Sequence, residues 1–402
     1  MQTDIGRPEP QHSPIAYRWI VLAVLFVART TMAYQFQSVI SAGPFIVDRF
    51  AIDYAQLGSL VGLYMLPGIL ISLPGGMLGQ RFGDKRIVVL GLSLMVLGGC
   101  LMASESYSIV LVGRLISGVG AVIINVLITK MVADWFAGQE IIAAMALLIA
   151  SWPSGIALGL LTFPTLVAYG WSAPMLASAV AAALSLVGLI LLYRDHPQSP
   201  QSLPRLRLDL SPREWGHIIV LGIVWGSYNA GYIILISFLP EQFTQQGYSL
   251  VDASRLVSLM GWVLIPAVPI AGILAERISR PVVLMIGTLL ITALVVIAFP
   301  FTANPISALS ALVLVIGLPA GLLMALPAQV LPQSKRSAGM GVFYTCHYGC
   351  MAALPVFAGF LRDQSAAPHA PILFVGIMMV AIALTLAAER RLFSRQQFGS
   401  AP

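Results

Sequence analysis

The sequence is 402 residues long, with 58% hydrophobic residues, only 9% charged residues and a formal net charge of +6. A water-soluble domain carries about 25% charged residues, so this composition excludes an ordinary soluble protein. The net positive charge does not indicate a nucleic-acid partner, because the basic residues lie in short loops between apolar runs and form no basic face. The three cysteines lie inside apolar segments, so no disulfide framework is expected.

Long apolar runs recur along nearly the whole chain. A run of about 20 apolar residues is long enough to cross a bilayer as a helix. Residues 1–17 lack the apolar centre of a cleavable signal peptide, so the first run is expected to stay in the protein. We predict an all-α membrane protein whose twelve transmembrane helices cover residues 18–40, 55–75, 87–104, 108–132, 141–168, 173–193, 216–239, 255–275, 282–301, 306–330, 338–361 and 371–389.

The distribution of basic residues predicts the orientation in the membrane. Twelve spans put both termini on one side. The tails and loops of that side hold seventeen Lys and Arg residues, whereas the other side holds only Arg49, Arg255 and Arg362. Because loops rich in Lys and Arg stay in the cytoplasm, we predict a multi-pass protein of the cell (inner) membrane with both termini cytoplasmic.

The sequence also repeats at a fixed offset of 196 residues. We therefore predict an N-terminal six-helix half over 1–193, a polar, Pro-rich cytoplasmic linker over 194–215, and a C-terminal six-helix half over 216–402. Parallel repeats of this kind place a substrate site at their interface, near the middle of the bilayer. The matched pairs are Trp19 with Trp215, Pro44 with Pro240, Gly76 with Gly272, Leu78 with Leu274 and Arg81 with Arg277.

The loop after the second span carries a family signature. It reads GMLGQRFGDKR from Gly76 to Arg86 and resembles the G-x-L-x-D-R-x-G-x-R-R motif of the major facilitator superfamily, with Gln80 in place of the motif's Asp. The resemblance implies the two-half facilitator fold and a role for this loop in conformational change. Arginines of such a loop can bond helix carbonyls and acidic partners. The residues that match the motif are Gly76, Arg81, Gly83 and Arg86.

Three further segments resemble facilitator patterns. Residues 113–120 (GRLISGVG) look like the R-x-x-x-G-x-G pattern of facilitator helix 4, and residues 151–159 partly resemble helix 5 of drug antiporters. Residues 35–44 (QFQSVISAGP) are similar to the first helix of cyanate and nitroimidazole transporters. Those transporters carry an Arg where this chain has Gln35, and here an Arg stands earlier, at Arg29.

Three ionisable side chains are predicted inside the spans, namely Arg29, Arg114 and His347, whereas the 16 acidic residues all lie in loops, tails or helix ends. A charge at mid-membrane costs at least about 2.5 kcal/mol, and such groups usually face a water-filled path. A path with fixed positive and no fixed negative charge suits an anion. It does not suit the cationic drugs that many exporters carry.

The repeat indicates which residues share the centre of the membrane. Arg29 is about 16 Å along the helix from Arg18, near mid-depth. The stripe that begins at Arg29 maps onto a polar and aromatic stripe that begins at Trp225. Two equivalent helices with such stripes at one depth are what a shared substrate site needs. The predicted substrate-binding residues are Arg29, Gln37, Arg114, Asn125, Asn229, Tyr232 and His347.

Each ionisable residue also has a structural interpretation. Arg29 can bond a neighbouring backbone carbonyl, and Arg114 can tie helix backbones together instead of serving in binding or coupling. His347 can carry a coupling proton, because histidine titrates near neutral pH, or remain a neutral packed side chain. The nearby Cys346 and Cys350 do not converge with His347 on one point, so no metal site is predicted.

The leading functional prediction is a secondary active transporter that moves a small, anionic solute by alternating access, with protons as the coupling ion. The sequence contains no Gly-rich phosphate loop ending in Lys-Ser or Lys-Thr, so no ATPase is predicted. It also contains no paired embedded carboxylates, metal ligands or nucleophile triad, so no enzyme activity or cofactor is predicted. The alternatives are a proton antiporter that exports amphiphilic or drug-like compounds, and a transporter-like receptor. The predicted partners are the small-molecule substrate, protons and the lipid bilayer, with no nucleic acid, and the protein is expected to be a monomer.

Overall fold

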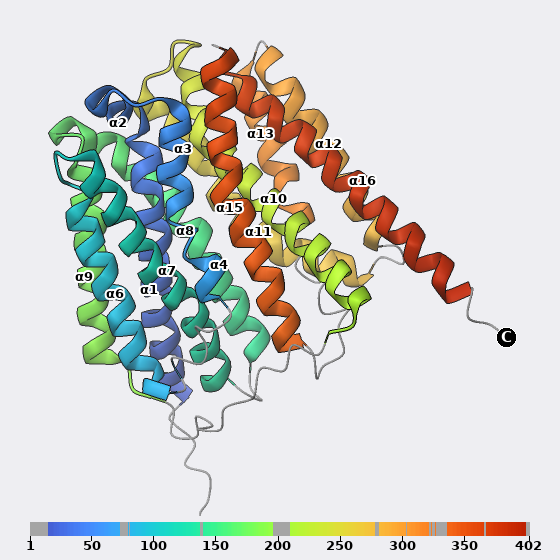
Figure 1. Ribbon diagram of the computed structural model, residues 1–402, viewed down its shortest axis with the longest axis horizontal. Helices are drawn as coiled ribbons and strands as arrows, with labels where there is room; N and C mark the ends of the chain where they lie inside the picture. The colour runs from blue at the N-terminus through green and yellow to red at the C-terminus, as the bar shows by residue number, and fades with distance from the viewer. Residues whose placement is uncertain are drawn as a thin grey trace, which may run out of the picture.

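The computed structural model describes residues 15–72, 79, 81–136, 140–195, 210–277, 281–302, 304–320, 323, 326, 336–365 and 367–398. All regular elements in these segments are helices. They stand side by side in two groups, one formed by the first half of the chain and one by the second (Figure 1).

Each predicted span overlaps a helix of the structure. The first group contains α1 (Ile15–Ser41), α2 (Gly43–Phe50), α3 (Tyr54–Leu63), α4 (Gly68–Ile71), α6 (Asp84–Leu101), α7 (Tyr107–Trp135), α8 (Ile141–Leu166) and α9 (Ala173–Leu192). The second group contains α10 (Pro212–Thr244), α11 (Leu250–Arg277), α12 (Pro281–Ala298), α13 (Pro305–Ile316), α15 (Arg336–Ser365) and α16 (Ala370–Phe398).

The outer surface of the bundle is apolar. Within the described segments, nine helices are long and apolar enough to cross a membrane. Their large hydrophobic side chains are often exposed, and Leu184, Leu294 and Ile377 expose 69%, 68% and 63% of their surface. Water-soluble monomers rarely expose large contiguous apolar patches, so these helices contact lipid.

The second span differs from the single helix predicted over 55–75. Helix α3 starts with a capping box, in which the Asp53 carboxylate accepts from the Gln56 backbone amide at 2.7 Å and the Gln56 side chain accepts from the Asp53 amide at 3.1 Å. It ends at Leu63, four residues before Pro67. Proline has no amide proton and its ring clashes with the carbonyl four residues earlier, so Pro67 divides the span into α3 and α4.

The second half begins earlier than predicted. Ser211 and Glu214 form a capping box, and Pro212 occupies the first turn, where proline is favoured. Helix α10 therefore starts at Pro212, so the linker predicted over 194–215 ends before that residue. The helix also runs past the predicted end at 239, to Thr244, and includes Pro240.

The two halves pack through α3 against α15 and through α8 against α11. Glycines allow the closest approaches. A Cβ added at Gly359 would lie 2.0 Å from the Tyr54 carbonyl oxygen, and one at Gly62 would lie 2.1 Å from the Ala352 carbonyl oxygen. Backbone atoms cannot move away as a flexible side chain can, so α3 and α15 touch along their length only because these positions lack side chains.

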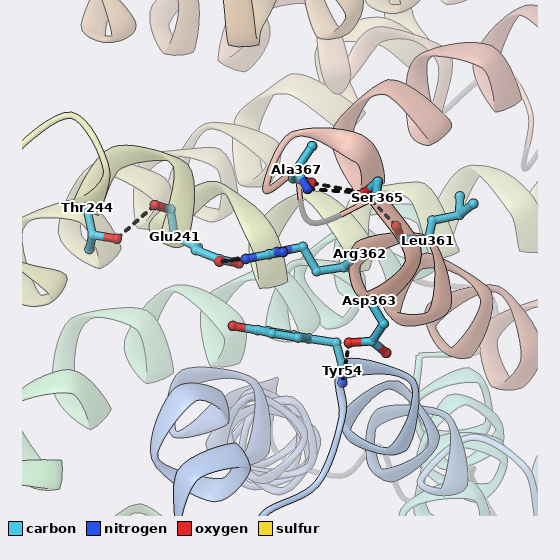
Figure 2. A network of polar contacts seen from close by, with 8 residues as sticks. All are labelled: Tyr54, Glu241, Thr244, Leu361, Arg362, Asp363, Ser365 and Ala367. Carbon is cyan, nitrogen blue, oxygen red and sulfur yellow. Dashed lines mark hydrogen bonds and ion pairs between the residues drawn. The ribbon is translucent and has the colours of Figure 1, made fainter.

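Polar contacts close one end of this interface, and we call it the sealed end. Asp363 of α15 accepts a hydrogen bond from the backbone amide of Tyr54 at 3.0 Å, at the first turn of α3 (Figure 2). It accepts a second from the Ala55 amide at 2.9 Å. Helix N-termini attract carboxylates, because their first amides are unpaired. Next to it, Arg362 lies over the Tyr54 ring at 5.0 Å and pairs with Glu241 of α10 at 2.7 Å.

Candidate functional site

Arg29 lies midway along α1 and is held by the first half of the bundle. Its Nε donates to Asn125 Oδ1 of α7 at 3.0 Å. Its Nη1 donates to the Leu148 carbonyl of α8 at 2.6 Å and to Ser151 Oγ at 3.4 Å. Within the part of the chain that the structure describes, Nη2 makes no hydrogen bond and Arg29 forms no ion pair. The side chain is only half-buried, so a fixed cation keeps one nitrogen available for a ligand.

Asn125 connects this arginine to the second half. Its Nδ2 donates to the Tyr348 hydroxyl of α15 at 2.9 Å. Because Asn125 accepts from Arg29 and donates to Tyr348, the guanidinium group stands on the face of the first half that is turned towards the second. The structure thus brings together Arg29 and Asn125, two of the residues that the sequence analysis proposed for substrate binding.

Aromatic rings of α10 and α15 gather around Tyr348. The His347 ring lies 5.2 Å from Tyr348, 6.0 Å from Tyr344 and 6.2 Å from Trp225, and it is nearly parallel to the indole, at 28°. His347 Nδ1 is buried without a hydrogen-bond partner among the described residues. The predicted site residue His347 therefore belongs to a ring cluster that Asn125 joins to Arg29.

The two other predicted residues of α10 have different surroundings. Asn229 is half-buried, and its Nδ2 donates to the Trp225 carbonyl one turn earlier at 2.8 Å. Tyr232 is buried, and its hydroxyl has no partner within the described segments. Asn229 thus lies beside the ring cluster, while Tyr232 lies deeper in the second half.

Gln37 is placed apart from Arg29, about 12 Å further along α1. It is fully buried and donates from Nε2 to Ser41 Oγ at 3.1 Å. Gln37 and Ser41 line a cavity of about 270 Å³ at the sealed end, together with Tyr54 and residues of α10 such as Ser237. The cavity lining is mostly apolar, so it provides few polar contacts for a ligand.

Arg114 has the geometry of a structural tie. It is 0% exposed and donates to three backbone carbonyls: Leu60 at 2.9 Å, Gln35 at 3.2 Å and Phe36 at 3.1 Å. The Tyr64 ring covers its charge at 4.5 Å. In this conformation Arg114 has no surface for a ligand, which favours the structural alternative over the predicted role in binding.

Loss of this tie is expected to destabilise the fold. Hydrogen bonds to charged groups contribute about 1.5–3 kcal/mol each, so we expect Arg114→Leu to lower the free energy of unfolding by roughly 3 kcal/mol or more. Thermal unfolding of the purified protein would measure this effect. Arg49→Ala is the matched control, because Arg49 is exposed and pairs with Glu105 at the surface, where ion pairs contribute about 0–1 kcal/mol. Equal stability of Arg114→Leu and wild type would contradict the structural role.

The facilitator signature loop is only partly described, and Gly76 and Gln80 lie outside the described residues. Arg81 and Arg86 are exposed. Gly83 has φ 89°, a left-handed conformation that favours glycine, directly before α6. The loop is tied down by Asp84, which is buried and pairs with Lys130 of α7 at 2.5 Å.

Several contacts of the signature loop and the sealed end were not predictable from the sequence. In the sequence, Asp84, Glu241, Arg362 and Asp363 lie in loops or at helix ends, and nothing there indicates their partners. The contacts join residues up to 309 positions apart, so spacing along one helix cannot reveal them. Tyr348 could have been found from its position next to His347.

Comparisons with known proteins agree with this architecture. The sequence profile of the Major Facilitator Superfamily matches residues 25–355 and 230–397. The chain is 24% identical to the uncharacterized transporter YycB of Bacillus subtilis, over 97% of both chains. It is 27% identical to the cyanate transport protein CynX of Escherichia coli, over 78% of this chain and 83% of that one. A solved D-xylose–proton symporter has a TM-score of 0.75 at 15% identity, over 92% of this chain and 97% of that chain. The predicted facilitator fold is confirmed.

Proposed function

The chain belongs to the Major Facilitator Superfamily, and from this premise we propose that it moves a small organic or inorganic anion across the membrane by alternating access. Its matched family and relatives are transporters, so the chain is a multi-pass membrane transporter. The relative named for cyanate transport supports an anionic substrate.

The observation that carries the proposal is that Arg29 Nη2 has no hydrogen-bond partner among the residues that the structure describes. A guanidinium group near mid-membrane costs free energy to bury, and such groups usually mark substrate pathways. Three hydrogen-bond partners fix its position, and none of its described partners is a carboxylate. The charge is therefore not neutralised within the described residues. An anion that arrives between the halves supplies the missing negative charge.

Alternating access requires the halves to separate at one end and then at the other. The contacts of Asp363 with α3 support a state that is closed at the sealed end. This end is opposite to the starts of α1 and α10, and the excess of basic residues on the termini side favours a cytoplasmic location for the termini. The sealed end then faces outwards from the cell (inner) membrane, and the protein acts as a monomer built from an N-terminal half over 1–193 and a C-terminal half that begins with α10 at Pro212.

We assign the coupling proton to His347, because it is a titratable group in the ring cluster that Asn125 joins to Arg29. The test is anion uptake into proteoliposomes with and without an imposed pH gradient. In the wild type, a gradient that is acidic on the side of anion entry raises uptake, whereas in His347→Gln it has no effect. A gradient response that survives in His347→Gln would remove this assignment and leave the anion site in place.

A second candidate is export of amphiphilic compounds by proton antiport. The apolar lining of the 270 Å³ cavity, formed by residues such as Ile40, Leu57 and Phe238, favours it. The absence of an acidic residue at mid-span in the sequence argues against a cationic cargo.

Thermal unfolding across a panel of small anions and neutral amphiphiles distinguishes the two candidates. A ligand that binds only the folded state at one hundred times its dissociation constant adds about 2.7 kcal/mol of stability. The proposal expects stabilisation by an anion. Stabilisation by neutral amphiphiles alone would replace the anion transporter with the exporter.

A further inference from the structure

The internal repeat makes two unlike side chains equivalent. The 196-residue offset maps Arg29 of α1 onto Trp225 of α10. In a protein of two repeated halves, equivalent residues lie at the same depth on opposite sides of the central axis. A molecule bound at that axis therefore meets a guanidinium group on one side and an indole ring on the other, and both side chains are half-buried.

Arg29 recognises the charge of the ligand but discriminates little between ligands of different shape. A bidentate contact with a carboxylate or phosphate needs two neighbouring donor nitrogens. Nε is bonded to Asn125 and Nη1 to the Leu148 carbonyl, so Nη2 remains as a single free donor nitrogen within the described segments. An anion that bound through this one nitrogen alone would be recognised mainly by its charge. Selectivity must come from the other side of the site.

The other side is a cluster of aromatic rings. The Trp225 indole lies nearly parallel to the His347 ring at 6.2 Å and to the Tyr228 ring at 6.1 Å. Tyr344 meets His347 edge-on at 6.0 Å, at 84°. The rings of Trp225, Tyr344 and His347 are all half-buried. A flat, conjugated ligand can stack on such rings, whereas a tetrahedral or aliphatic one cannot use them fully.

We infer that the substrate is an aromatic monocarboxylate, whose carboxylate accepts from Arg29 Nη2 and whose ring stacks against Trp225. This inference rests on the proposed anion transport and names its substrate class. The side-chain amide of Asn125 bonds both Arg29 and Tyr348, so it fixes the distance between the guanidinium group and the ring cluster.

The test compares benzoate with cyclohexanecarboxylate, which has the same charge and nearly the same size but no π-face. Binding is measured by calorimetry on the full-length protein in detergent. We expect the wild type to bind benzoate roughly two- to tenfold more tightly, the factor that aromatic stacking contributes beyond buried area. Trp225→Leu is expected to bind both acids equally, and Trp225→Phe to keep most of the preference. Trp262→Leu is the control, because Trp262 is 39% exposed on α11 and lies outside the site.

The outcomes separate this inference from the proposed function. Equal affinity of the wild type for the two acids, with both lost in Arg29→Ala, would overturn the aromatic class and keep the anion site. If the protein binds another anion but neither of these two acids, the aromatic class is overturned as well. A benzoate preference that persists in Trp225→Leu would remove Trp225 from the site. If Trp225→Leu does not fold, the wild-type preference and Trp225→Phe still decide the inference.

Discussion

Replacing Arg29 with alanine is expected to abolish anion binding and uptake while the protein still folds and inserts. The variant loses the only free donor nitrogen that we assign to the substrate. A charge-assisted hydrogen bond contributes about 1.5–3 kcal/mol, and loss of the fixed charge adds to this, so affinity should fall by at least about tenfold. Unliganded stability should fall less than in Arg114→Leu, because Arg29 is half-buried and donates to one backbone carbonyl, whereas Arg114 is fully buried and donates to three.

Two further variants define the role of the charge. Arg29→Lys keeps the charge and cannot reproduce the fork that bonds Asn125 and Leu148 together, so it should restore part of the binding. Arg255→Ala is the control, because Arg255 is exposed and pairs with Asp252 on its own helix. Binding is measured by thermal shift with anions, and uptake in proteoliposomes. Full uptake by Arg29→Ala would exclude Arg29 from substrate binding.

A side chain added at Gly359 is expected to prevent closure of the sealed end. A Cβ there would lie 2.0 Å from the Tyr54 carbonyl oxygen, 2.5 Å from its carbonyl carbon and 2.9 Å from the Ala55 amide nitrogen. All three are backbone atoms of α3, so the clash can be relieved only by separating the halves. Gly359→Val should therefore shift the protein towards a state that is open at this end, and transport should be lost.

Cysteine labelling can measure this shift. Ser254 lines the cavity at the sealed end and is 2% exposed, so Ser254→Cys should react slowly with a water-soluble maleimide when the end is closed. Gly359→Val should raise its labelling rate at least about tenfold, the factor that 1.4 kcal/mol supplies. Gly349→Val on the same helix is the control, because a Cβ there meets nothing within 4 Å. The native cysteines Cys100, Cys346 and Cys350 are replaced with alanine throughout. An unchanged labelling rate in a folded Gly359→Val would contradict the closure.

The helices were predictable because the free energy of placing a residue in lipid depends mainly on its own chemistry. The break after Leu63 was not anticipated, although Pro67 carries the signal for it. The early start of α10 is likewise encoded in the Ser211–Glu214 capping box, which the apolar-run criterion ignores. Both differences arise because proline and helix capping, and not only hydrophobicity, decide where a helix begins and ends.

The candidate site was predictable in part. The sequence singled out Arg29 and Asn125, which the structure joins, and His347, which it places in the adjoining ring cluster. It could not tell Arg29 from Arg114, since both are arginines inside apolar spans. The structure distinguishes them by their partners: Arg114 donates to three carbonyls, whereas Nη2 of Arg29 has no hydrogen-bond partner within the described segments.

By itself, the sequence determined that this chain is an all-helical membrane protein of the facilitator fold, and it predicted twelve spans in two repeated halves with positive charge at mid-depth, because the hydrophobicity and charge of each segment can be read from that segment alone. Only the tertiary structure decided which arginine is available to a ligand, that Asp84 meets Lys130, and that Asp363 caps α3. These contacts depend on how each helix is rotated and how closely it packs. Backbone approaches at glycines such as Gly62 and Gly359 set that packing, and no pattern within a single helix records which neighbour they meet.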